Sequence, residues 1–163
     1  MPVDFVTLLR RDHADLQREL TQLLDPSASA HDLRTALDGV RLGLTAHAEA
    51  EDIVLSRLAG FPALEALIDR ARAAHRIQET ALGGLVRAAP QTDTWRERAT
   101  HLRDLVGCHA VQEEREILPA LRASTPRDAF AQLAGAFATE RLRQLAMLQP
   151  SMPIYIPDDA RPC

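Results

Sequence analysis

The feature that constrains this chain most is an apolar stripe with alternating spacings of three and four residues, which recurs from residue 3 to residue 148. This spacing places side chains on one face of an α-helix. Between residues 30 and 58 the stripe contains Leu33, Leu37, Val40, Leu44, Val54 or Leu55, and Leu58. His47 and Glu51 stand in its middle, and residues four apart on a helix point the same way within about 40°. Burying a carboxylate there is costly unless a partner compensates for it.

The stripes, caps and helix breakers predict five helices, at about residues 3–24, 30–58, 62–88, 93–123 and 126–148. Pro119 should kink the end of the fourth helix. Because the first four helices are joined by short connections, we expect them to pack as antiparallel neighbours. The expected fold class is all-α, an antiparallel up-down four-helix bundle with an additional C-terminal helix that forms a lid or a dimer surface. Residues 1–148 would form this domain, and residues 149–163 an extended or disordered proline-rich tail.

Composition narrows the class of protein. Apolar residues make up 46% of the 163 residues and aromatic residues only 4%, which favours a helical core over a β-sandwich. The net charge of -4 argues against nucleic acid or an anionic membrane as the main partner. No apolar run reaches membrane-spanning length, and the first residues have no signal-peptide core. We expect a cytoplasmic monomer or homodimer.

Four histidines, His13, His47, His75 and His109, each occupy a stripe position near the midpoint of their own predicted helix. Helix midpoints lie at one level of such a bundle, so four imidazoles should converge in one core layer. Glu51, Glu79 and Glu113 each follow one of these histidines by four residues. A single core histidine is more often hydrogen-bonded to a neighbour than bound to a metal. Four in one layer, with carboxylates, predict a metal site.

The predicted metal ligands are therefore His13, His47, Glu51, His75, Glu79, His109 and Glu113. Imidazole and carboxylate donors suit iron or manganese, and their number exceeds what one tetrahedral zinc uses. Glu79 is a ligand, a partner of a ligand, or a gate at the bundle edge.

Other polar residues lie off the stripes. We expect Glu49, Asp52 and Glu114 to be surface charges, and His31 and His101 to be exposed. Cys108 should be a buried or half-buried residue turned away from His109, and not a ligand.

The ordered set Asp12-His13, His47-Ala48-Glu49-Ala50-Glu51, Ala74-His75-Arg76 and His109-Ala110-Val111-Gln112-Glu113 resembles the hemerythrin-like (HHE cation-binding) family. The resemblance covers about residues 3–123. It implies a four-helix bundle that holds two Fe ions in an oxo- or hydroxo-bridged di-iron centre. Members of this family bind or sense oxygen, handle nitric oxide or peroxide, or take part in iron homeostasis.

Departures from the oxygen-carrying members shape the functional expectation. Those members have HxxxH on the third helix and HxxxxD on the fourth, whereas this chain has Glu79 four residues after His75, and both Glu113 and Glu114 after His109. An anionic ligand at Glu79 would favour ferric iron and disfavour reversible oxygen carriage.

The resemblance then implies a redox protein that binds or reacts with O2, NO or H2O2 in redox stress, with possible peroxide- or nitric-oxide-decomposing activity. The alternative is a non-catalytic oxygen, NO or iron sensor or storage module that signals through the fifth helix or the tail. No side chain is assigned a catalytic role.

Overall fold

The computed structural model describes residues 3–149, which contain helices and no strands. The α-helices are α1 (Phe5–Gln22), α2 (Ala30–Ser56), α3 (Pro62–Val86), α4 (Asp93–Gln112), α5 (Leu118–Ser124) and α6 (Arg127–Leu148), and a short π-helix, η1 (Glu113–Ile117), joins α4 to α5. The all-α prediction is confirmed. The predicted tail, residues 149–163, lies outside the described residues except for Gln149.

Polar caps fix the starts of three of the long helices. The Asp4 carboxylate accepts a hydrogen bond of 2.8 Å from the Thr7 N–H, and the Thr92 hydroxyl accepts one of 3.1 Å from the Trp95 N–H. Ser29 and Asp32 form a reciprocal capping box at the start of α2. Because the first N–H groups of a helix have no partner within it, each such cap stabilises its helix by about 1 kcal/mol.

The predicted fourth helix is interrupted one turn before Pro119. There the Leu118 N–H bonds to the Glu113 carbonyl, five residues earlier, as in a π-helix. Pro119 has no N–H, and in a regular helix its ring would clash with the carbonyl of Arg115. The wider turn at Glu113–Ile117 removes this conflict, so the effect of Pro119 falls on the segment that contains Glu113.

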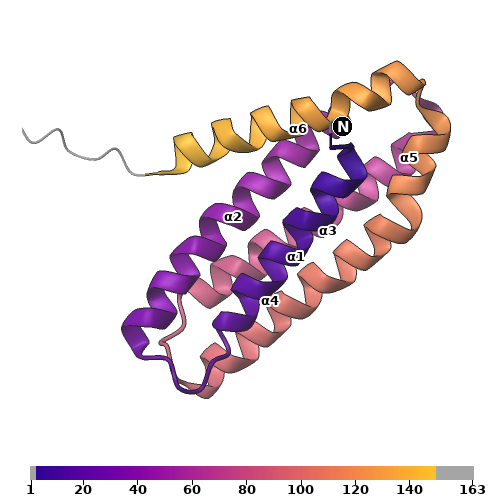
Figure 1. Cartoon of the computed structure of the whole chain (residues 1–163). Helices are drawn as coiled ribbons and strands as arrows, with labels where there is room; N and C mark the ends of the chain where they lie inside the picture. Colours follow the sequence, from indigo (N-terminus) through magenta and orange to yellow (C-terminus); the bar gives the residue numbers. More distant parts are fainter. Residues whose placement is uncertain (1–2, 150–163) are drawn as a thin grey trace, which may run out of the picture.

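The first four helices lie side by side (Figure 1). α1 packs against α2 and α4, and α3 packs against the same two helices from the other side. α6 runs along α2 and also contacts α1, so it covers this side of the bundle (Figure 1). Within residues 3–149, no helix is both long enough and apolar enough to cross a membrane.

The apolar core consists of two separate clusters. One contains Phe5, Val54, Ile117 and Phe137 among its buried residues, and the other contains Leu20, Leu37, Leu82 and Trp95. In α1, α2 and α3, the residues of one cluster lie before the histidine and those of the other lie after it. In α4 the residues before His109 belong to one cluster, and those of the other follow in η1 and α5. The four histidines therefore form a polar layer between two apolar regions, each of which stabilises the fold by removing apolar area from water.

Candidate metal centre

The four predicted histidines meet in the middle of the bundle. The ring centroids lie 5.1 Å apart for His13 and His47, 6.1 Å for His47 and His75, 4.8 Å for His75 and His109, and 6.4 Å for His109 and His13. Each imidazole comes from a different helix, and none is more than 5% exposed. The predicted convergence in one layer is confirmed.

Two glutamates lie inside this ring, and both are completely buried. Glu113 Oε2 is 3.1 Å from His13 Nε2 and 3.7 Å from His109 Nε2. Glu51 Oε2 is 3.3 Å from His47 Nε2 and 3.7 Å from His75 Nε2. Each carboxylate thus faces the imidazoles of two helices.

The donor atoms form two overlapping groups, each with its atoms within 4.8 Å of one another. The first consists of His47, Glu51, His75 and His109, and the second of His13, His47, Glu51 and Glu113. The carboxylate oxygens of Glu51 and Glu113 are buried without a hydrogen-bond donor. His75 Nε2 lies 3.1 Å from His109 Nε2. Because the Asp52 carboxylate accepts from Nδ1–H of His75, the Nε2 atom of neutral His75 is an acceptor that faces the cluster. A metal cation would satisfy the buried carboxylate oxygens and the imidazole nitrogens, and the residues present fit a metal site.

Burial and mutual charge separate the pKa values of the two glutamates. Burial, together with the negative charge of Glu113, raises the pKa of Glu51 well above its ordinary value. Burial also opposes ionisation of Glu113, but its contact with His13 outweighs burial and lowers its pKa. Burial, assisted by the other three imidazoles, lowers the pKa of His109 to about 4 despite the opposing charge of Glu113. His109 is therefore neutral, and available as a ligand, at neutral pH.

Three further carboxylates hold the rings from outside. The Nδ1 atoms of His47, His75 and His13 lie 2.8 Å from Asp12, 2.9 Å from Asp52 and 3.0 Å from Glu114. A hydrogen bond from Nδ1 fixes the tautomer and turns the Nε2 lone pair toward the centre, as is typical of metal-binding histidines.

The prediction that Asp52 and Glu114 are surface charges is wrong, and Asp12 was not singled out as a partner. Side chains at these positions lie between neighbouring helices, which the stripe of a single helix does not reveal. The available signal was adjacency, because each of the three is next to a predicted ligand in the sequence.

α6 supplies side chains that contact Asp12 and His47. Arg141 donates to both Asp12 oxygens, at 2.6 Å from Nη2 to Oδ1 and 2.9 Å from Nε to Oδ2. Burial raises the pKa of Asp12, but the contacts with His47 and Arg141 outweigh it, and the pKa is lowered overall. Phe137, also on α6, packs edge-on against the His47 ring at 6.0 Å. A continuous chain of contacts therefore runs from α6 through Asp12 to His47.

The structure brings six of the seven predicted ligands together and leaves Glu79 outside. The buried stripe of α3 continues from His75 to Gln78, Leu82 and Leu85, whereas the sequence analysis placed Glu79 on it. The stripe through Gln78 and the stripe through Glu79 both advance in steps of three and four residues. Which of the two side chains is buried therefore depends on the orientation of α3 about its own axis relative to α2 and α4. Glu79 is exposed, at the rim of a cavity between α2 and α3. With Glu79 exposed, α3 brings no anionic ligand to the cluster, so the expected preference for ferric iron loses its basis.

The remaining polar residues follow the sequence analysis with one exception. His31, His101 and Glu49 are exposed, as predicted. Cys108 is also exposed, so its predicted burial is wrong, because it lies on the solvent side of α4 beside the buried His109.

Comparison with known families agrees with this geometry. The family profile described as the hemerythrin HHE cation binding domain matches residues 4–121, which contain all four histidines and both buried glutamates. Comparison of the chain with curated proteins and with solved structures gave no match. Since the family match spans most of the chain and includes the buried cluster, this protein belongs to the hemerythrin HHE cation-binding domain family.

Proposed function

We propose that this protein is a non-haem di-iron protein, built as an antiparallel up-down four-helix bundle, that binds or reacts with O2, NO or H2O2 in redox stress. One observation carries the proposal. Four imidazoles and two carboxylates, with their donor atoms in two overlapping groups, fill a dry layer between two apolar clusters. Two groups of donors favour two metals over one, and nitrogen and oxygen donors favour iron or manganese.

The ligand roles follow from the two groups. His75 and His109 would hold one iron and His13 the other. His47 and Glu51 belong to both groups, and Glu113 faces both His13 and His109, so the two glutamates would help to hold both metals. When bound, iron supplies the redox electrons and the open coordination positions at which a small ligand reacts.

The chain itself would orient and insulate this centre. Asp12, Asp52 and Glu114 hold three of the four rings, so little reorganisation is needed when metal binds. The apolar clusters on both sides exclude water from the layer, which strengthens charge interactions within it. The seventh predicted ligand, Glu79, is exposed and is better placed as a gate at the bundle edge than as a ligand.

A non-catalytic sensor is the second candidate, and one observation favours it. The contacts from Arg141 through Asp12 to His47 link α6 to a predicted ligand, so a change at the metal could shift α6. Such a shift would need different contacts in the two ligand states.

Metal analysis with an optical spectrum of the aerobically purified protein tests the proposal. We expect two irons per chain and an oxo-to-iron charge-transfer band, whereas one metal or none contradicts the di-iron assignment. Catalytic oxygen evolution from peroxide would favour the enzyme. A stoichiometric spectral change without turnover would favour the sensor.

A further inference from the structure

A cavity of about 300 Å³ lies between α2 and α3 and reaches one side of the candidate metal centre. His75 forms part of its wall. The His75 ring has Asp52 at Nδ1 and His109 at Nε2, so one ring connects the cavity to the buried cluster. The polar residues of the wall that matter here are Glu49, Asp52, His75, Arg76, Gln78 and Glu79.

Gln78 indicates that this cavity takes a ligand. The side chain is only 2% exposed, and neither its amide oxygen nor its amide nitrogen has a hydrogen-bond partner. A buried amide without hydrogen-bond partners destabilises the fold unless a ligand satisfies it. Gln78 follows His75 by three residues on the buried face of α3 and lines the same cavity. Its carbonyl oxygen is an unpaired acceptor, able to bind a cation, one helical turn from a predicted metal ligand.

The charge of the cavity indicates what kind of ligand it takes. Its wall has three carboxylates, Glu49, Asp52 and Glu79, against one guanidinium, Arg76. A concave surface with an excess of one sign of charge concentrates ions of the opposite sign. Carboxylate and amide oxygens are also the ligands of hard divalent cations. The volume holds roughly ten waters at about 30 Å³ each, enough for a cation with its hydration shell.

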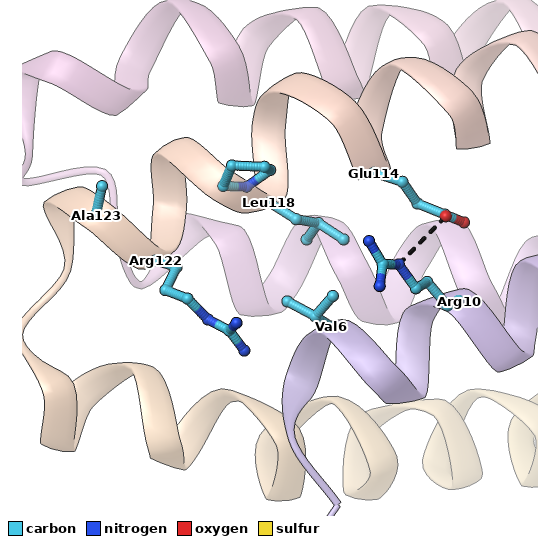
Figure 2. A pocket seen from close by; sticks show the side chains of 7 residues that line it. Val6, Arg10, Glu114, Leu118, Arg122 and Ala123 are labelled. Atoms are coloured by element: carbon cyan, nitrogen blue, oxygen red, sulfur yellow. Dashed lines mark ion pairs between the residues drawn. The ribbon is translucent and has the colours of Figure 1, made fainter.

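A second cavity, between α1 and α5, has the opposite character (Figure 2). It has a volume of about 320 Å³ and is lined by Arg10 and Arg122, with Glu114 as its carboxylate. Figure 2 shows Arg10 paired with Glu114, at 3.3 Å. This cavity also touches a residue that holds a predicted ligand, but both of its guanidiniums are paired, Arg10 with Glu114 and Arg122 with Asp4, so it has no excess of negative charge to attract a cation.

We propose that the α2–α3 cavity is the vestibule through which a hydrated divalent cation reaches the metal centre, with Gln78 Oε1 as a transient ligand beside His75. The inference rests on the proposed function, since it presupposes that the buried cluster binds metal. The cluster itself is closed to solvent, so metal must pass some wall of the bundle. Glu49 and Glu79 attract the cation at the rim, and Gln78 replaces part of its water shell further in.

Stopped-flow loading of the metal-free, full-length protein with Co2+, followed by cobalt absorption, tests this proposal. In E49Q/E79Q we expect loading to slow by about tenfold or more and to lose most of its salt dependence, because the attracting charge is gone. The final cobalt stoichiometry should equal that of the wild type. In Q78L we expect slower loading with an equal or higher melting temperature, since no unpaired amide remains.

Two controls make the result specific. E65Q/E97Q removes the same charge from exposed positions of α3 and α4 outside the cavity and should load at the wild-type rate. R122Q alters the cavity of Figure 2 and should not slow loading.

Three outcomes would overturn the proposal. Unchanged loading in both E49Q/E79Q and Q78L rejects the vestibule. A reduced final stoichiometry in E49Q/E79Q makes these residues equilibrium ligands and also rejects it. A wild-type protein that binds neither Co2+ nor Fe2+ rejects the proposed function itself, which separates the two failures.

Discussion

At the scale of single residues, the site consists of imidazole rings paired with carboxylates. The Nδ1 atoms of His13, His47 and His75 have carboxylate partners, whereas His109 Nδ1 is buried without one. The two central glutamates have pKa values shifted in opposite directions. Burial and then the charge of Glu113 raise the pKa of Glu51, whereas contact with His13 outweighs burial at Glu113 and lowers its pKa. The metal-free core therefore holds acceptors that only a proton or a cation can satisfy.

This charge pattern predicts a specific effect of E51Q on the metal-free protein. The pKa of Glu51 in the folded protein lies above the ordinary value of 4.5. Its contribution to the free energy of unfolding is therefore fully present below pH 4.5 and is lost as the pH rises through the raised pKa, where the buried carboxyl must ionise. A glutamine at this position does not ionise, so E51Q avoids this loss of stability. We expect the metal-free variant to be more stable than metal-free wild type at pH 8, by about 1–4 kcal/mol, and to depend less on pH above 4.5.

Thermal unfolding of both chelated proteins between pH 4.5 and 8 checks this expectation. The variant should also bind fewer metal ions than the wild type, because Glu51 belongs to both groups of candidate ligands. An E51Q protein that is less stable than the wild type at pH 8 would show that Glu51 is held by groups other than a metal.

At the scale of elements, η1 and α6 add contacts that orient the histidine rings, which four regular helices alone would lack. The wide turn of η1 presents two consecutive acids to α1, since Glu113 contacts His13 Nε2 and Glu114 contacts Nδ1 of the same ring. π-turns of this kind are frequent at functional sites. α6 supplies Arg141, which holds Asp12 and thereby the ring of His47.

The role of α6 leads to a second prediction. R141Q leaves Asp12 with one charged partner fewer, so the His47 ring becomes less well oriented, and we expect metal affinity to fall by about tenfold. R143Q is the matched control, because Arg143 lies on the same helix and pairs with Glu140 and not with the site. Competitive cobalt titration of both variants measures the effect, and equal affinities for R141Q and wild type would show that α6 only covers the bundle.

At the scale of the whole molecule, the polar layer divides the hydrophobic core. The apolar cluster that contains Phe5 and the cluster that contains Trp95 lie on opposite sides of the histidines, so the bundle is weakest in the middle when metal is absent. A bound metal would link histidines from all four helices at this level and so stabilise the layer between the two apolar clusters.

Metal removal should therefore lower thermal stability. A ligand present at 100 times its dissociation constant stabilises the native state by roughly 2.7 kcal/mol. For a chain of this size that corresponds to a decrease of about 5–10 °C in melting temperature after exhaustive chelation. Differential scanning calorimetry before and after chelation, followed by readdition of Fe2+, tests this. An unchanged melting temperature would mean that the cluster does not bind metal in the folded protein.

Local patterns alone determined most of the fold and the centre of the site. Stripe spacing predicted the ends of the helices within about a turn, although not the π-helix that interrupts the predicted fourth one. The mid-helix positions of His13, His47, His75 and His109 predicted their convergence. These features are readable from sequence because they depend on the geometry of one helix and on short connections.

Only the tertiary structure decided which neighbours complete the site. Whether Gln78 or Glu79 faces inward, and whether Asp12, Asp52 and Glu114 contact a ring or water, depends on how each helix is rotated against the next. A stripe with steps of three and four permits either rotation. The packing of large side chains across several helices selects one of them, and no single segment contains that information.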